Sequence, residues 1–262
     1  MIGIRQLFFF DIDGTLAHRG QIPASNRYVL EALRQKGHLT FICTGRPVAY
    51  AQQLFGDLVD GIIANNGRYG TLHGSVMYRK PFTLEERKHY RSLFASLGCP
   101  YVFLGNAQGY AGGFSPQEMA DASRRFCWEG FFTDQWELSE IDAYSFDLYY
   151  RDDAHFAQIE QALKGQVVLN DHVGAHSADG STCDFDKGHG IAAMLQALSL
   201  PQARSFAFGD GQNDVCMFRS VDIRVAMGNA VPALKEAADF VTKPFDRDGL
   251  LYACLLYTSR CV

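Results

Sequence analysis

The sequence predicts an α/β fold built on a parallel sheet, with a second, smaller α+β module in the middle of the chain. Short apolar segments alternate with amphipathic segments of helical period in the N-terminal part, and the same alternation returns near the C-terminus. The order strand, helix, strand is typical of a parallel sheet with crossover helices. The middle of the chain, about residues 81–178, lacks this alternation and contains separate helical and strand-like segments.

Three strands are expected in the N-terminal part, at residues 7–10, 39–43 and 62–64, because each segment is apolar and too short for a helix. Ser25 is the expected N-cap of a helix that runs to Lys36 and ends at Gly37. Pro47 can begin the next helix, since the first helical turn does not need the N–H that proline lacks.

The rest of the chain supplies further expected elements. Helices are predicted over residues 84–97, 119–129, 188–197 and 231–237, and strands over 101–104, 144–150, 167–169, 205–208, 223–227 and 240–241. The tail, residues 255–262, fits poorly as the continuation of a closing helix that starts near residue 248. Whether the tail is native and ordered is left open.

The composition excludes several classes of protein. Hydrophobic residues make up 47% and charged residues 20% of the 262 residues, which is ordinary for a packed chain and unlike a disordered one. With 24 basic against 29 acidic residues the net charge is −5, so no broad basic field exists for nucleic acid. No apolar run is long enough for a membrane span or a signal peptide. We therefore expect a cytoplasmic protein, a monomer or small homo-oligomer, without nucleic-acid or membrane partners.

Acidic residues follow two of the predicted strands. Asp11 and Asp13 come after the strand at 7–10, and Asp210 and Asp214 come after the strand at 205–208. Ligands of open α/β sheets bind beyond the carboxyl ends of strands, so these four carboxylates converge if the two strands are neighbours. Four clustered negative charges repel one another unless a cation lies among them. Because the four carboxylates supply only oxygen ligands, the expected cation is Mg²⁺, bound together with a substrate phosphate.

A carboxylate at such a site can also act as a nucleophile toward phosphorus. The counter-charge and donors that this needs are offered by Thr44, Gly45 and Arg46 after the second strand and by Lys187 at the start of a helix. Gly14 and Gly45 would let backbone N–H groups approach phosphate oxygens closely.

A second carboxyl group could assist the reaction from beside the nucleophile. Asp13 lies two residues after Asp11, on the same side if the strand geometry persists. A carboxyl there could protonate a leaving alkoxide and then deprotonate water for a second step.

Four short motifs now give a family resemblance. Asp11-Ile12-Asp13-Gly14-Thr15, then Thr44-Gly45-Arg46, Lys187-Gly188 and the string from Gly209 to Asp214 resemble, in this order, the four motifs of the haloacid dehalogenase-like hydrolases. The stretches at 225–230 and 238–241 resemble the Cof-type subfamily, whose members are mostly sugar-phosphate or related phosphatases. The long interval between Thr44 and Lys187 resembles the type IIB arrangement, in which a large α+β cap is inserted between motifs two and three. The implied architecture is a Rossmann-like core of residues 1–82 and 179–262 with a cap of residues 83–178.

The resemblance implies a Mg²⁺-dependent phosphatase that acts on a small phosphorylated metabolite, and it implies roles for single residues. Asp11 would be the nucleophile, forming an aspartyl-phosphate, and also a metal ligand. Asp13 would be the general acid/base and would lend its backbone carbonyl to the metal. Thr44 would hydrogen-bond the phosphoryl group, and Lys187 would neutralise nucleophile and phosphate. Asp210 would be a metal ligand, and Asp214 would be a ligand or a supporting anchor. Arg46 and Asn213 would support the site or contact the substrate.

Several alternatives stay open at this point. The motifs also suit a phosphomutase or phosphotransferase, or a non-catalytic regulator that binds sugar phosphates. Lys164 is a distant rival of Lys187, because it too precedes a glycine. The turn at residues 65–67 could face the substrate or be only a turn. The specificity loops are guessed to lie at 110–113 or 128–132.

Overall fold

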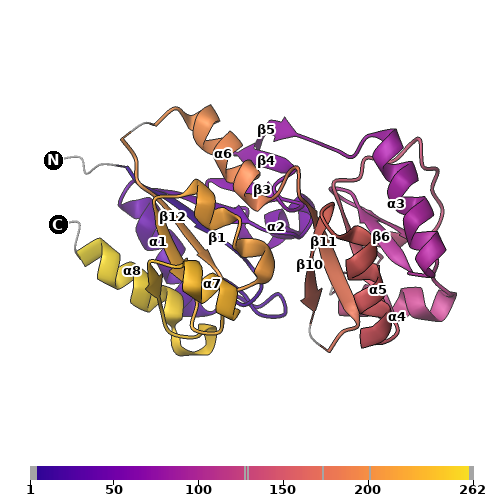
Figure 1. Cartoon of the computed structure of the whole chain (residues 1–262). Helices are drawn as coiled ribbons and strands as arrows, with labels where there is room; N and C mark the ends of the chain where they lie inside the picture. Colours follow the sequence, from indigo (N-terminus) through magenta and orange to yellow (C-terminus); the bar gives the residue numbers. More distant parts are fainter. Residues whose placement is uncertain (1–4, 127, 129, 173, 201, 260–262) are drawn as a thin grey trace.

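Two β-sheets, one in each half of the molecule, organise the fold (Figure 1). The computed structural model describes residues 5–126, 128, 130–172, 174–200 and 202–259. The chain passes from the first sheet to the second after β5 (Ser75–Arg79) and returns before α6 (Lys187–Leu198), and its described ends, near residues 5 and 259, both lie on the side away from the second sheet. Within the described residues, no helix has the length and apolar character needed to span a bilayer.

The first sheet has eight strands and is parallel over most of its width. In sheet order its strands are β14 (Phe240–Val241), β13 (Ile223–Ala226), β12 (Ser205–Gly209), β1 (Leu7–Phe10), β2 (Leu39–Cys43), β3 (Gly61–Ala64), β4 (Tyr69–Leu72) and β5 (Ser75–Arg79). Pairing is parallel from β14 to β3, and β4 and β5 add an antiparallel hairpin that sequence analysis missed. β1 pairs with β12, with Phe10 opposite Phe208. The two strands expected to carry the acidic residues are therefore neighbours.

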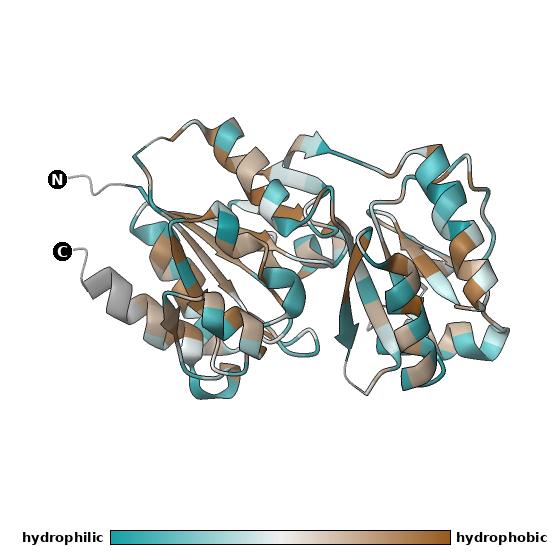
Figure 2. Cartoon of the chain, in the orientation of Figure 1, coloured by the Kyte–Doolittle hydropathy of each residue, from teal (hydrophilic) through white to brown (hydrophobic). Residues whose placement is uncertain are grey.

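Helices cover both faces of this sheet, which explains why β1 is apolar at every position. Phe8 and Phe10 point into one core, and Leu7 and Phe9 point into the other. The helices are α1 (Ala24–Gln35), α2 (Val48–Phe55) and α8 (Gly249–Ser259) on the first core and α6 (Lys187–Leu198) and α7 (Pro232–Ala237) on the second. Figure 2 shows the strands as the most hydrophobic part of this half, with polar residues on the outer helix surfaces. The predicted α/β class is confirmed.

The second sheet has six strands and is mainly antiparallel. In sheet order its strands are β10 (Val167–His172), β11 (Ser177–Thr182), β9 (Ser145–Tyr149), β6 (Tyr101–Leu104), β7 (Gly109–Gly112) and β8 (Phe132–Thr133). The helices α3 (Leu84–Leu97) and α5 (Asp153–Leu163) pack on one face, and α4 (Pro116–Arg125) lies over part of the other. The expected helix over 84–97 is confirmed, with Thr83 as the N-cap and Gly98 as a left-handed C-cap.

Several expected boundaries were wrong. Ser25 does not cap α1, because the helix begins at Ala24 and Pro23 is its N-cap. The helix expected over 119–129 begins and ends earlier, as α4, and residue 129 lies outside the described residues. The domain boundary between residues 178 and 179 stays a prediction; β11 spans it, and all six residues of this strand belong to the second sheet. A closing helix does form and reaches Ser259, while residues 260–262 of the expected tail lie outside the described part.

Candidate functional site

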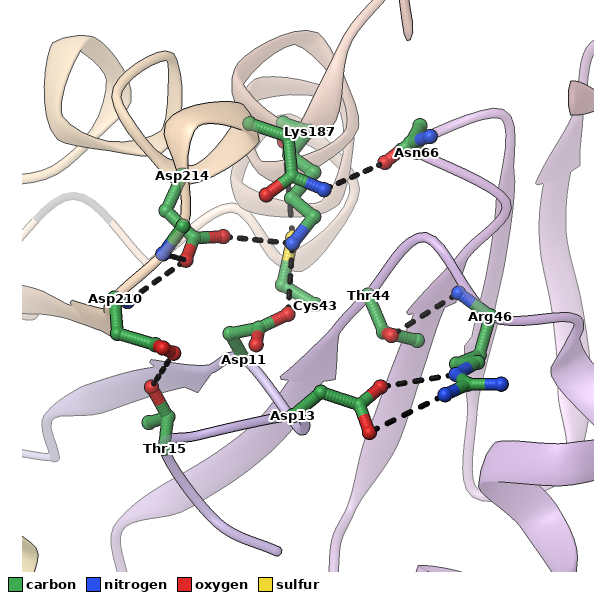
Figure 3. Close-up of polar contacts among 12 residues, drawn as sticks. Asp11, Asp13, Thr15, Cys43, Thr44, Arg46, Asn66, Lys187, Asp210 and Asp214 are labelled. Carbon is green, nitrogen blue, oxygen red and sulfur yellow. Dashed lines mark hydrogen bonds and ion pairs between the residues drawn. The ribbon is translucent and has the colours of Figure 1, made fainter. Parts of the chain in front are cut away.

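The carboxyl ends of β1 and β12 bring three carboxylates together (Figure 3). The backbone N–H of Asp11 donates to the carbonyl of Phe208 at 2.9 Å, which extends the parallel pairing to the first acidic residue. Ligand oxygens of Asp11, Asp210 and Asp214 lie within 4.8 Å of one another. Oxygen donors this close together can hold a hard divalent cation.

Lys187 lies between Asp11 and Asp214 of this cluster and is completely buried. Its Nζ donates to Asp11 Oδ1 at 2.7 Å and to Asp214 Oδ1 at 2.6 Å. The lysine is the first residue of α6, and the Asp186 carboxylate caps that helix by accepting from the His189 backbone N–H. The rival Lys164 is exposed at the end of α5 and does not line the cavity described below.

Asp214 is fully enclosed and serves as an anchor in this structure. Its Oδ2 accepts the backbone N–H groups of Asp210 and Gly211, both at 2.9 Å, while Oδ1 accepts from Lys187. Both oxygens are thus already engaged, so Asp214 fixes the loop after β12 and the position of the lysine.

Asp210 is held from two sides. Its Oδ1 accepts from the Thr15 hydroxyl at 2.9 Å and its Oδ2 from the Asn229 amide at 3.1 Å. Gly14 has a φ of +87°, and a Cβ there would lie 2.2 Å from Asp210 Oδ2. Only glycine fits at this point of the loop. Neither Thr15 nor Asn229 was predicted as a site residue, although both lie within the motif segments.

The pKa values in the cluster show an excess of negative charge. Burial, followed by repulsion from Asp214, raises the pKa of Asp11 well above its ordinary value. The same two causes raise the pKa of Asp210 to about 7. Burial opposes the charged form of Lys187, but Asp11 and Asp214 hold the pKa of its ammonium group above the ordinary value. When all three carboxylates are ionised, one ammonium group leaves two negative charges uncompensated, and one divalent cation would neutralise them.

Asp13 points away from this cluster and pairs with Arg46. The Arg46 Nε donates to Asp13 Oδ2 at 2.9 Å, and its Nη1 donates to the backbone carbonyl of Phe126 in the second half of the molecule at 3.1 Å. The guanidinium also lies over the rings of Tyr50 and Phe126. Thr44 is buried beside it and accepts from the Arg46 backbone N–H. Arg46 therefore connects Asp13 to the other sheet.

A cavity of about 640 Å³ opens above these residues, between the two halves. Asp11, Asp13, Gly14, Thr44, Gly45, Arg46, Asp210 and Asn213 line its floor. Of the residues predicted for the site, Lys187 and Asp214 do not line the cavity, because both are enclosed beneath it.

The second sheet supplies the roof of the cavity, from residues that sequence analysis missed. The main polar ones are Asp147, Asn170, His172, Ser177 and Asp179. Alternation of polar Ser145, Asp147 and Tyr149 with apolar Phe146 and Leu148 was a signal that one face of β9 is polar. The guessed specificity loops at 110–113 and 128–132 contribute no described residue to the cavity, and residue 129 lies outside the described residues.

Asp179 joins the two halves. Its Oδ2 accepts from the Asn66 amide at 3.0 Å and from the Asn213 amide at 3.4 Å, both on the first half of the molecule. Its Oδ1 accepts from Asn170 at 2.9 Å and lies 3.2 Å from His172 Nε2. The turn at 65–67 therefore reaches the second sheet through Asn66, and it does not line the cavity.

Comparisons with known proteins agree with this arrangement. The family model of haloacid dehalogenase-like hydrolases matches residues 8–254. A protein named "Putative phosphatase YkrA" from Bacillus subtilis is 31% identical over 258 residues, covering 95% of this chain and 96% of its own length. The 5-amino-6-(5-phospho-D-ribitylamino)uracil phosphatase YwtE of the same organism is 26% identical and covers 92% of this chain and 94% of its own length.

A solved structure gives the same result for the fold. The structure of BT4131, described as a sugar phosphatase of subclass IIB, has a TM-score of 0.80 and 28% sequence identity, covering 97% of this chain and 99% of its own. The predicted Rossmann-like core with an inserted cap and the phosphatase class are thereby confirmed. We call the part around the first sheet the core and the part around the second sheet the cap. Since the family model spans nearly the whole chain, this protein belongs to the haloacid dehalogenase-like hydrolases.

Proposed function

We propose that this protein is a Mg²⁺-dependent phosphatase that hydrolyses small phosphomonoesters, sugar phosphates or related metabolites, through an aspartyl-phosphate on Asp11. The observation that carries the proposal is the buried Lys187, which bridges Asp11 and Asp214 beneath an open cavity. Only one Asp11 oxygen is engaged by a donor within the described residues, and Asp11 lines the cavity floor. A phosphate entering the cavity would meet the other oxygen.

The donor set fits Mg²⁺. Asp11, Asp210 and the backbone carbonyl of Asp13 would hold the ion, with Asp214 as ligand or anchor, and all of these donors are oxygen atoms. The ion would supply positive charge that lets an anionic nucleophile and an anionic phosphate approach each other. The raised pKa values of Asp11 and Asp210 support this assignment, because they reflect repulsion that a cation would relieve.

The side chains would then divide the reaction into two steps. Asp11 attacks phosphorus while the ester oxygen leaves and takes a proton from Asp13. Water, deprotonated by Asp13, next attacks the same phosphorus, which releases inorganic phosphate and restores the Asp11 carboxylate. Thr44, the N–H groups near Gly14 and Gly45, and Lys187 would stabilise the charge on the phosphoryl oxygens. Arg46 orients Asp13, and Asn213 supports the cap through Asp179.

Phosphate release is the direct test of this function. Wild type is incubated with Mg²⁺ and p-nitrophenyl phosphate or a panel of sugar phosphates, without any added acceptor, and compared with Asp11→Asn. We expect release by wild type and none by the variant, with circular dichroism showing both folded. Turnover that requires a sugar acceptor would indicate a phosphomutase or phosphotransferase, and binding without turnover would indicate a regulator. The cytoplasmic location and the oligomeric state stay predictions from the sequence.

A further inference from the structure

The cap sheet presents a polar face to the cavity. Directly paired residues of antiparallel strands place their side chains on the same face. Asp147 of β9 pairs with Asp179 of β11, and Asp179 pairs with Asn170 of β10. All three line the cavity, opposite the carboxylates of the core. Two carboxylates thus lie next to each other in the cavity roof.

The two carboxylates differ in the number of hydrogen bonds that they receive from the protein. Asp179 receives hydrogen bonds from three amides and from His172. Burial opposes its charge, but these donors, His172 first, lower the pKa of Asp179 to about 2. Asp179 is therefore an ionised residue with fully used oxygens, and it holds cap and core together.

Asp147 has no such partners. It is only 4% exposed and lines the cavity, yet within the described residues no donor hydrogen-bonds its carboxylate. Burial is the main reason why the pKa of Asp147 rises to about 6. Its oxygens are not among the enclosed side-chain atoms that lack a partner, so the carboxylate faces the cavity, where a ligand can reach it. Low exposure and a like charge directly across the strand both oppose its ionisation. Such a group at the wall of a cavity is explained if a ligand supplies the missing donors.

We propose that Asp147 is a specificity-determining residue, whose carboxylate accepts hydrogen bonds from hydroxyl groups on the leaving group of the substrate. This inference rests on the proposed phosphatase function, because the leaving group is the part of a phosphomonoester that faces the cap when phosphate lies on Asp11.

The charges around Asp147 favour neutral hydroxyls over ammonium or acidic groups. His172 and Arg125 also line the cavity, and both His172 and Arg46 act on Asp147 electrostatically. These cations disfavour a cationic leaving group, while Asp179 disfavours a second anion. A neutral polyol avoids both penalties and offers several donors.

The test compares two esters of equal carbon number that differ in hydroxyl groups, sorbitol 6-phosphate and n-hexyl phosphate. The measured quantity is the ratio of their kcat/KM values with Mg²⁺ for wild type, Asp147→Ala and the isosteric Asp147→Asn. Asp171→Ala is the matched control, because it removes an exposed carboxylate from the same sheet outside the cavity. Thermal unfolding and hydrolysis of p-nitrophenyl phosphate show whether each variant is folded.

We expect wild type to prefer sorbitol 6-phosphate and Asp147→Ala to lose this preference by about 10- to 100-fold, as expected for a lost hydrogen bond to a charged group. Asp147→Asn should lie between the two, and Asp171→Ala should keep the wild-type ratio. An unchanged ratio in folded Asp147→Ala overturns the proposal, as does a preference of wild type for glucosamine 6-phosphate over glucose 6-phosphate. If wild type hydrolyses p-nitrophenyl phosphate without preferring sorbitol 6-phosphate to n-hexyl phosphate, this inference alone fails. If wild type hydrolyses no ester, the proposed function fails with it.

Discussion

Replacing Lys187 with methionine tests whether its ammonium group compensates the charge of the buried carboxylates. The substitution keeps an unbranched side chain and removes the ammonium group that lies 2.7 Å from Asp11 and 2.6 Å from Asp214. At an effective dielectric constant near 20, each of these ion pairs has a Coulomb energy of about 6 kcal/mol before desolvation is subtracted. Because desolvation offsets much of this, the net loss of stability expected on breaking a buried pair is about 3–5 kcal/mol.

The same substitution should slow catalysis. The transition state would lose one positive group aimed at the nucleophile and the phosphoryl oxygens, which typically costs about 10²- to 10³-fold in kcat. The assays are steady-state hydrolysis of p-nitrophenyl phosphate with Mg²⁺ and urea unfolding of the metal-free protein. Lys164→Met is the matched control, since Lys164 is an exposed cap lysine. We expect this control to match wild type in both assays.

Two results would contradict these roles of Lys187. If folded Lys187→Met keeps more than about a tenth of the wild-type kcat, well above the residual activity expected after loss of such a group, the lysine does not stabilise the transition state. If its unfolding free energy equals that of wild type, the carboxylates do not depend on it for charge compensation.

Three further predictions concern the groups around the cavity. Asp179→Asn should lower the pKa of His172 from about 9, because burial opposes the charge and the main partner carboxylate is gone. A His172 resonance still titrating near 9 by NMR would contradict the proposed ion pair. Because burial raises the pKa of Asp147 to about 6, stability should fall as pH rises from the unfolded pKa of about 4 to about 6, where the penalty is complete. Asp147→Asn should therefore be more stable than wild type at pH 8, by up to about 3 kcal/mol, and the difference should vanish near pH 4; equal urea midpoints at both pH values would refute this. Gly14→Ala should weaken Mg²⁺ binding, measured by calorimetry, by about 10- to 100-fold, because its Cβ would lie 2.2 Å from Asp210 Oδ2; wild-type affinity would show that the loop adjusts.

The core of the fold and the floor of the site could be predicted because their signals are local. The run at 7–10 is apolar on both faces and is followed at once by the acidic motif, so strand and site residues are read from one short segment. The convergence of Asp11 with Asp210 required only that β1 and β12 be neighbours, and they are.

The cap strand β11 shows why other parts could not be predicted. Its sequence, residues 177–182, is small and polar and has little intrinsic preference for a strand. It forms a buried strand because β9 and β10 pair with it on either side, and Phe146 packs over Gly180, where a Cβ would lie 2.1 Å from the ring. These contacts form only in the folded cap, so the pattern of neighbouring residues in the sequence does not reveal them.

The cavity roof was missed for the same kind of reason. Asp147, His172 and Asp179 belong to different strands, and they meet only when the cap sheet folds and lies over the core. Arg46 was expected to be a support or a substrate contact, and in the structure its guanidinium binds Asp13 and a cap carbonyl while lining the cavity. Its partner in the cap is 80 residues away in sequence.

The central claim is that the phosphoryl group passes through Asp11, and trapping that intermediate tests it most directly. Wild type is mixed with Mg²⁺ and p-nitrophenyl phosphate, quenched in acid during turnover, reduced with borohydride and analysed by peptide mass spectrometry. Reduction of an aspartyl-phosphate gives homoserine, so the account predicts homoserine at position 11 only in the sample that received substrate. Homoserine at another aspartate, or full phosphatase activity in Asp11→Asn, would contradict it.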